Sequence, residues 1–370
     1  MSTPVHDPAS AVNTTQAAPG RCDCQAITPR TFHTLTALSV RADSSHLQRK
    51  LAVLLAAQGL TSDLPAGPMT IPRAAFDRLA AVLNAFSRIE RAELLAMPWY
   101  AGHLDAWQVA PLTQWLQRVT TPWFDTVSDH LTFHFQPIVQ LRTGAVYGYE
   151  ALVRAEQHGQ HRGAELLLQA AAAHGQARAF DAQARKTAIR QGYPQLQADQ
   201  QLFINFAPGV VYNPDICLQT TFATCREVGA DFSRLVFEVT ESEAFPDLTL
   251  LRSILERYRQ EGAQVALDDL GAGHTSLNYL SELKPDIVKL DRGLVSGLHR
   301  EDRRVPLITA LIGYAHDLGI RVVAEGIETP DELAQIIALG ADYAQGYFLG
   351  RPSPVAAEVL PEAAAFWPLR

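Results

Sequence analysis

Two adjacent aspartates end an apolar run in the segment VALDDLGAGHTSLNYL, which covers residues 265–280. Side chains alternate across a β-strand, so Asp268 and Asp269 can both reach into one cleft only from the end of a strand. Other polar residues stand in or at the ends of apolar runs elsewhere in the chain. These residues are Asn205 in LFIN, Glu238 in LVFEVTE, Lys289 in DIVKLD, Glu325 in VVAE and Gln345 after DYA.

This set of side chains indicates a site for divalent metal ions. Carboxylates that are crowded together repel one another and raise their own pKa values unless a cation neutralises them. Carboxylate and amide oxygens are ligands for hard divalent cations, and Asp268 could bridge two of them. Two neighbouring ions suit the hydrolysis of a phosphodiester, because they activate a water and stabilise the leaving oxygen. Lys289 would then orient that water or offset charge on the phosphate.

These residues need a scaffold that brings the ends of several strands together. After about residue 130 the sequence turns to short β-rich runs separated by amphipathic helical stretches. The predicted helices 248–262, 305–319 and 329–340 each end in glycine. The alternation predicts an α/β fold, a (β/α)8 TIM-type barrel, whose carboxyl strand ends face one common site. The predicted strands cover residues 133–141, 146–153, 201–207, 234–240, 264–269, 286–291, 320–326 and 341–349.

Several motifs resemble one known family. The segment YEALVR, with Glu150 and Leu152, resembles the signature of the EAL-domain family of bacterial cyclic di-GMP phosphodiesterases. The segments FQPIV, INFAP, FEVTE, DDLGAGHTSL, VKLD, VAEGIE and QGYFLGRP resemble other blocks of that family, in the same order, over residues 131–355. The GGDEF signature of the partner cyclases is absent, so synthesis of cyclic di-GMP is not expected. The sequence departs from the family pattern at Ala155, Ala207, Leu270 and His274, none of which is an expected metal ligand.

The resemblance implies a modified barrel whose first strand runs antiparallel. It also implies a hydrolase that opens cyclic di-GMP to linear pGpG with two ions of Mg²⁺ or Mn²⁺ per site. Ca²⁺ would inhibit, because it prefers a larger and looser oxygen shell. Carried over position by position, the first ion would be held by Glu150, Asn205, Glu238 and Asp268. The second ion would be held by Asp268, Asp269 and Glu325.

The same resemblance implies the catalytic and substrate-binding roles. Lys289 would contact the attacking water, with Glu325 as a further catalytic group. Arg154 would bind a substrate phosphate through its planar guanidinium. Glu241 would steady the glycine-containing loop after the aspartate pair; the alternative of a solvated acid just past a strand stays open. The residues expected to complete the substrate side are Gln136, Leu152 and Gln345.

Two other functions compete with an active phosphodiesterase. One is a cyclic di-GMP receptor that keeps the pocket and signals through the N-terminal region. Loss of a ligand residue would favour the receptor, and every expected ligand position is filled here. The other is an unrelated metal-dependent barrel hydrolase, which would make the order of the motif blocks a coincidence. Conversion of cyclic di-GMP to pGpG by the purified protein would separate these alternatives.

The region before the barrel offers no chemistry of its own. We expect a flexible tail at residues 1–20, a mostly helical domain at 21–128 that could regulate the barrel, and the EAL-type barrel at 129–370. Residues 44–59 and 71–86 have helical periodicity, and four tryptophans crowd into residues 99–123, which predicts a local aromatic core. Cys22, Cys24 and His33 fall short of a four-ligand zinc pattern.

Composition places the chain among globular proteins. It has 370 residues, of which 47% are hydrophobic, and a formal charge of -8 that arises after residue 130. This balance gives no basic face for duplex nucleic acid. No signal peptide or membrane segment is recognisable, and the four cysteines are scattered, so we expect a cytoplasmic protein. The resemblance further implies a homodimer formed through the barrel.

Overall fold

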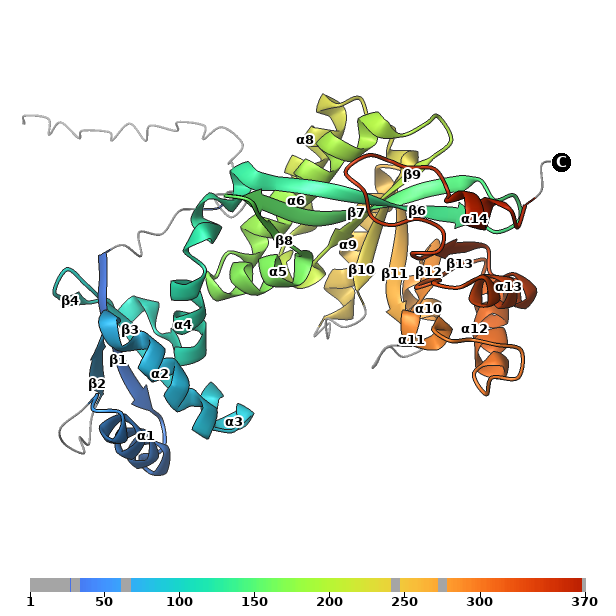
Figure 1. The fold of residues 1–370 in the computed structure, drawn as a ribbon. Helices are drawn as coiled ribbons and strands as arrows, with labels where there is room; N and C mark the ends of the chain where they lie inside the picture. Colours follow the sequence, from blue (N-terminus) through green and yellow to red (C-terminus); the bar gives the residue numbers. More distant parts are fainter. Residues whose placement is uncertain (1–26, 28–33, 61–67, 241–246, 272–277, 368–370) are drawn as a thin grey trace, which may run out of the picture.

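The structure is a computed structural model that describes residues 27, 34–60, 68–240, 247–271 and 278–367. Figure 1 shows two parts, a smaller N-terminal unit of strands and helices and a larger barrel. The expected tail at residues 1–20 lies outside the described residues. Within the described part of the chain, no helix combines the length and the apolar character that crossing a bilayer requires.

The barrel is closed by eight strands, as predicted. The ring runs β6-β14-β13-β12-β11-β10-β9-β7 and closes through pairing of β6 with β7. Strand β6 is antiparallel to both of its neighbours, and the other adjacent pairs are parallel, which confirms the modified barrel. A short strand, β8 (Gln160–Arg162), pairs with β7 outside the ring. The ring strands are β6 (Leu131–Gln140), β7 (Val146–Gln157), β9 (Gln201–Phe206), β10 (Leu235–Thr240), β11 (Gln264–Leu270), β12 (Ile287–Leu290), β13 (Arg321–Ala324) and β14 (Tyr343–Gln345).

Helices cover the outside of the ring (Figure 1). Their ends follow the expected capping chemistry: Thr329 and Glu332 form a capping box at the start of α13, and Gly340 ends that helix in the left-handed conformation. The three predicted helices are confirmed as α9 (Leu248–Gln260), α12 (Val305–Asp317) and α13 (Pro330–Leu339). The other barrel helices are α5 (Ala164–Ala173), α6 (Ala177–Gly192), α7 (Pro214–Cys217), α8 (Gln219–Glu227), α10 (Asn278–Leu283), α11 (Arg292–Val295) and α14 (Pro361–Ala364).

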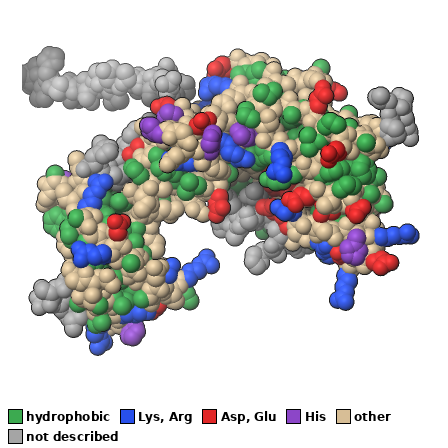
Figure 2. All heavy atoms as spheres, viewed as in Figure 1, with side chains coloured by type: hydrophobic (Ala, Val, Ile, Leu, Met, Phe, Trp, Pro, Cys, Tyr) green, Lys and Arg blue, Asp and Glu red, His purple; other side chains and the backbone are tan. Residues whose placement is uncertain are grey.

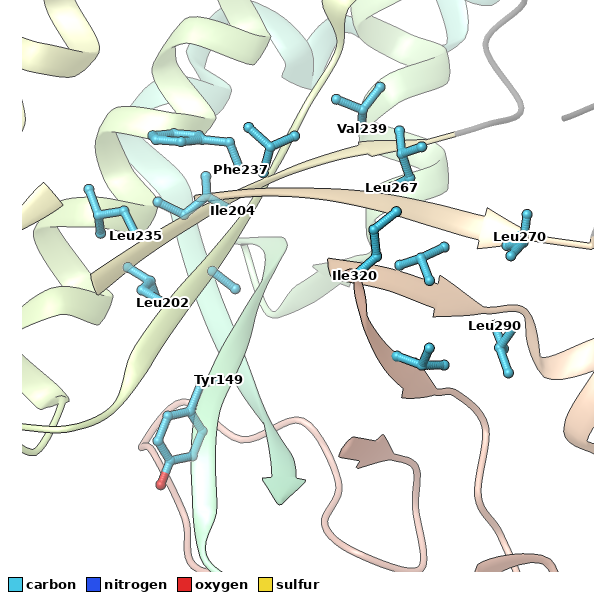
Figure 3. Packing of buried hydrophobic residues seen from close by; sticks show 14 of the residues in the cluster. Tyr149, Leu202, Ile204, Leu235, Phe237, Val239, Leu267, Leu270, Leu290 and Ile320 are labelled. Carbon is cyan, nitrogen blue, oxygen red and sulfur yellow. The ribbon is translucent and has the colours of Figure 1, made fainter. Parts of the chain in front are cut away.

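Alternation along each strand divides the core into an outer and an inner part. Outward residues such as Ile204 and Phe237 pack against the helices in one large cluster, part of which Figure 3 shows. Inward residues form a separate apolar layer inside the barrel. This layer fills the barrel and forms a floor beneath the carboxyl ends of the strands. Its members are Ile138, Phe203, Val236, Ala266, Ile287, Val323 and Tyr343.

The N-terminal unit contains a five-stranded antiparallel sheet in addition to helices. The prediction of a mostly helical region therefore missed its sheet, because short strands of two to four residues carry almost no periodic signal. Helix α1 confirms the prediction for residues 44–59, but Ile71 and Pro72 end strand β2 and do not start a helix. The elements are β1 (Leu35–Ala42), α1 (Ser45–Ala57), β2 (Met69–Pro72), α2 (Phe76–Val82), α3 (Arg88–Ala92), β3 (Leu94–Tyr100), β4 (His103–Leu104), β5 (Ala110–Pro111) and α4 (Leu112–Thr120).

The predicted aromatic core is correct only in part. Trp115 is fully buried and packs with Leu112, Leu116 and Val119 along α4. Trp107, in contrast, is 96% exposed on the loop between β4 and β5. The error arose because closeness in sequence does not place side chains on one face of the fold.

Helix α4 joins the N-terminal unit to the barrel at the end of α5. The side chain of Gln114 donates to the carbonyl oxygen of Ala172 at 3.1 Å, and Arg118 donates to that of Ala173. The last carbonyl groups of a helix have no partner within the helix, so α4 satisfies part of the end of α5. Thr121, just past α4, hydrogen-bonds to the buried ring of His174 at 3.0 Å. The two parts therefore share specific polar contacts.

Candidate active site

Each strand of the ring, within it or directly after its end, places a polar side chain above the apolar floor. Glu238, for example, follows the floor residue Val236 by two positions, and Lys289 follows Ile287 in the same way. Because the period of a strand is two, both members of each pair face into the barrel. Gln136 precedes Ile138 because β6 runs the other way. We call these residues the polar layer: Gln136, Glu150, Asn205, Glu238, Asp268, Lys289, Glu325 and Gln345.

The adjacent aspartates reach the same cleft through an irregularity in β11. The pairing of β11 with β12 shifts register between Leu267 and Leu270, and Asp269 has a positive φ of 61°. A bulge of this kind re-aims a side chain that regular alternation would turn outward. The backbone N–H of Asp269 donates to Oδ1 of Asp268 at 2.9 Å, which holds the pair together. The sequence predicted that both carboxylates reach the cleft but did not predict the bulge.

The structure brings the carboxylates into two groups that share one residue. Glu150, Glu238 and Asp268 can place one oxygen each within 4.8 Å of one another, and so can Asp268, Asp269 and Glu325. Within the described residues, neither oxygen of the buried Glu238 accepts a hydrogen bond. A buried carboxylate that accepts no hydrogen bond fits a cation ligand, because burying a carboxylate is costly unless positive charge compensates it. The donor set therefore fits hard divalent ions such as Mg²⁺ or Mn²⁺.

Lys289 lies among four of these carboxylates. Its Nζ atom is 2.6 Å from Oε1 of Glu325 and 3.0 Å from Oε1 of Glu238. It is also 3.3 Å from Oδ1 of Asp268 and 3.6 Å from Oε2 of Glu150. The ammonium group thus contacts members of both carboxylate groups, and it offsets part of their mutual repulsion.

The pKa values record this crowding. Burial raises the pKa of Glu238 and that of Asp268. Burial together with the charge of Asp268 raises the pKa of Glu325 to about 8 and that of Asp269 to about 6. Burial disfavours the charged form of Lys289, but the surrounding carboxylates outweigh it and raise the pKa of its ammonium group. With a pKa of about 8, Glu325 holds a proton near neutral pH, which a bound cation would displace.

Glu150 differs from the other acids because amide groups hold its charged form. Asn205 Nδ2 donates to its Oε1 at 2.8 Å, and Gln345 Nε2 donates to its Oε2 at 2.7 Å. Burial alone would raise the pKa of Glu150, but Lys289 and these two amides outweigh burial and lower it. Gln345 also donates to Oε1 of Gln136 at 3.1 Å. Glu150 is thus the most firmly oriented carboxylate of the layer.

A pocket opens over one side of the polar layer. Three of the predicted substrate residues, Gln136, Leu152 and Gln345, line it. Arg154 lies on the same face of β7 as Glu150 and Leu152, but it is not among the residues that line the described pocket. Its Nη1 donates to the carbonyl oxygen of Val153 at 2.8 Å. Glu241 lies outside the described residues, so the structure does not test its role.

Among the pocket residues that were not predicted from the sequence, three carry charged or aromatic side chains, and the other two are glycines. Arg292 and Glu328 form an ion pair of 2.9 Å at its edge, and Tyr347 is 44% exposed there. Each lies within or next to a motif block: Arg292 directly follows VKLD, Glu328 ends VAEGIE and Tyr347 lies in QGYFLGRP. A signal was therefore present in the sequence, but residue type alone does not separate a pocket edge from an ordinary surface position.

On the face in Figure 2, acidic and basic side chains are interspersed, without a continuous basic surface.

The barrel is similar to known proteins in sequence and in fold. The chain is 31% identical over 237 residues to the cyclic di-GMP phosphodiesterase NbdA of Pseudomonas aeruginosa. The aligned region covers 62% of this chain and 30% of NbdA. Among solved structures it resembles a standalone EAL protein of Vibrio cholerae in its c-di-GMP-bound form, with a TM-score of 0.57 and 32% identity over 63% of this chain and 97% of that one. It also resembles BlrP1 of Klebsiella pneumoniae in a calcium and cyclic di-GMP complex, with a TM-score of 0.57 and 29% identity over 62% and 57% of the two chains.

The curated relatives are longer proteins, and the chain spans about a third or less of the first three in that comparison. The similarity therefore concerns the barrel and not the whole of each relative. A sequence model described as the EAL domain matches residues 125–352, which include every strand of the barrel ring. The chain belongs to the EAL domain family.

Proposed function

We propose that this protein hydrolyses cyclic di-GMP to linear pGpG with two ions of Mg²⁺ or Mn²⁺ held in the polar layer. The observation that carries the proposal is the pair of carboxylate groups that share Asp268. Two neighbouring ions, held by groups that share one carboxylate, would suit phosphodiester hydrolysis. The names of NbdA and of the cyclic di-GMP complexes in the family support the substrate.

The proposed ion ligands follow the two groups. Bound ions would supply Lewis acidity, lowering the pKa of water and stabilising negative charge on phosphate oxygens. Asp268 would belong to both ligand sets because its carboxylate lies in both groups. The first set would be Glu150, Asn205, Glu238 and Asp268, and the second Asp268, Asp269 and Glu325.

The remaining residues would bind, orient and hold protons. The raised pKa of Lys289 keeps its ammonium protonated, so it can donate hydrogen bonds to a water or to a phosphate oxygen. Gln345 would keep Glu150 oriented by donating to its Oε2. Leu152 would give the pocket an apolar wall next to Gln136. We propose Arg154 as a phosphate ligand and Glu241 as the residue that steadies the loop after Asp269.

The test is product analysis with the purified full chain. With Mg²⁺ or Mn²⁺, cyclic di-GMP should be converted to pGpG, and EDTA or Ca²⁺ in place of these ions should stop the conversion. The variant Glu150→Ala should lose turnover and remain folded, because a cluster stripped of one carboxylate has less self-repulsion. Binding of cyclic di-GMP by the wild-type protein without any hydrolysis would instead establish a receptor.

We also propose that residues 21–128 regulate the barrel and that the protein acts as a cytoplasmic homodimer. The contacts of Gln114 and Arg118 with the end of α5 support the regulatory part. The dimer has the support of the family resemblance alone, and light scattering on the purified chain would test it. A monomer at working concentrations would rule the dimer out.

A further inference from the structure

Three buried side chains on α6 and α9 form a connected group outside the barrel wall. We call Asp181, Arg185 and Tyr258 the α6–α9 network. Nη2 of Arg185 lies 3.0 Å from Oδ2 of Asp181, and its Nη1 donates to the hydroxyl oxygen of Tyr258 at 2.8 Å. The exposed fractions of the three residues are 7%, 2% and 0%. An ion pair placed this deep is costly to desolvate, and helix packing alone does not require one.

The network holds the backbone at the end of β9. Oδ1 of Asp181 accepts a hydrogen bond of 2.9 Å from the backbone N–H of Ala207, two residues after Asn205. The intervening Phe206 packs edge-to-face against the ring of Tyr258, with ring centroids 5.3 Å apart. Asn205 itself turns inward and donates to Glu150. The strand end that carries Asn205 is therefore fixed from outside the barrel by Asp181 and Tyr258.

The network also contacts the neighbouring strand β10. The ring of Tyr258 stacks on that of Phe237, with centroids 3.8 Å apart and planes 18° apart. Phe237 directly precedes Glu238, and alternation turns these two side chains to opposite sides of the strand. Residues Asn205 and Glu238 are cross-strand neighbours in the register of β9 and β10. The α6–α9 network on the outside of the barrel thus packs against both β9, which carries Asn205, and β10, which carries Glu238.

We propose that Asp181, supported by Arg185 and Tyr258, is a positioning residue that fixes the end of β9 so that Asn205 and Glu238 keep their places in the candidate metal centre. The inference rests on the proposed metal-dependent function. Residues that orient metal ligands through a second contact typically change metal affinity about 10–100-fold when they are lost. A network that served stability alone would change the melting temperature and leave metal affinity unchanged.

A matched pair of double variants separates the hydrogen bond to Ala207 from the buried charges. Both D181N/R185M and D181L/R185M remove the ion pair, but only the asparagine keeps an oxygen that can accept from the Ala207 N–H. Calorimetric titration with Mn²⁺ alone measures affinity, and melting in EDTA measures stability. We expect D181N/R185M to bind Mn²⁺ within about threefold of wild type, and D181L/R185M to bind at least about tenfold more weakly.

Equal Mn²⁺ affinity in wild type and both double variants would overturn the inference. If D181L/R185M does not fold, Tyr258→Phe replaces it: loss of the hydroxyl should weaken Mn²⁺ binding, and unchanged binding would overturn the inference equally. The control is Ile312→Ala on α12, which removes a buried side chain away from the network. A comparable affinity loss in this control would also count against a positioning role. Failure of the wild-type protein to bind Mn²⁺ would refute the proposed function instead.

Discussion

Lys289 and Glu238 form an ion pair that is closed to solvent, with Nζ and Oε1 3.0 Å apart and the two side chains 1% and 0% exposed. Within the described residues the oxygens of Glu238 accept no hydrogen bond. A buried carboxylate with a single point charge as partner has ligand capacity left over. Lys289 thus neutralises only part of the negative charge of the polar layer, and the layer can accept further positive charge.

Replacing Lys289 with methionine should abolish turnover and destabilise the metal-free protein. The buried carboxylates would lose their common counter-ion, and breaking a buried pair from one side costs roughly 3–5 kcal/mol. Mn²⁺ should restore part of the lost stability, because the ions replace the missing positive charge. Thermal melting in EDTA and in Mn²⁺ measures both effects. A variant that melts like the wild type in EDTA would show that Lys289 does not balance the layer.

Metal affinity should rise with pH between about 6 and 8. In the metal-free protein the pKa of Glu325 is raised to about 8 and that of Asp269 to about 6. Ions bind the deprotonated carboxylates, so each bound proton must leave, and affinity falls as the pH drops through these values. Titrations with Mn²⁺ in buffers of different ionisation enthalpy would count the released protons. Affinity that is flat from pH 6 to 8, with no proton release, would contradict the assignment of these two ligands.

Gln345→Ala and Gln136→Ala should have different effects. Gln345 donates to Glu150 at 2.7 Å, so its loss should weaken Mn²⁺ binding about tenfold and lower kcat. Gln136 lines the pocket without a described contact to a carboxylate, so its loss should mainly raise KM for cyclic di-GMP. Steady-state kinetics at several Mn²⁺ concentrations separate the two parameters. Weaker Mn²⁺ binding in Gln136→Ala and a raised KM in Gln345→Ala would contradict the roles given to the two glutamines.

The double variant Gln114→Ala/Arg118→Ala should loosen the N-terminal unit from the barrel. It removes both donors that α4 offers to the end of α5. Hydrogen exchange of the α5 amides should increase, and kcat should change if the unit regulates the barrel. Lys50→Ala is the matched control, because Lys50 pairs with Glu90 inside the N-terminal unit. Increased exchange with an unchanged kcat would make the unit a passive attachment.

The barrel and most of its site could be predicted because their signals are local. Glu238, Asp268 and Lys289 each stand in an apolar run. Such a run predicts a buried strand, and a polar residue in it marks a candidate site position. The closed ring then forces their convergence, since alternation and register leave one possible face. The family resemblance supplied the roles, which residue type alone does not give.

Other features depend on contacts that a sequence does not display. The bulge at Asp269 arises from pairing between β11 and β12, and the five-stranded sheet of the N-terminal unit from strands as short as two residues. The pair Asp181 and Arg185 sits four residues apart on α6, where it reads as an ordinary surface ion pair. Only the packing of α6 and α9 on the barrel reveals that this pair is buried.

The most direct test of the account is a crystal of the full chain soaked in Mn²⁺ and measured at the manganese absorption edge. We predict two anomalous peaks in the polar layer, one among Glu150, Asn205, Glu238 and Asp268 and the other among Asp268, Asp269 and Glu325. Asp268 should contact both ions. Manganese bound elsewhere, or an empty polar layer in crystals of a protein that hydrolyses cyclic di-GMP in the same buffer, would contradict the account.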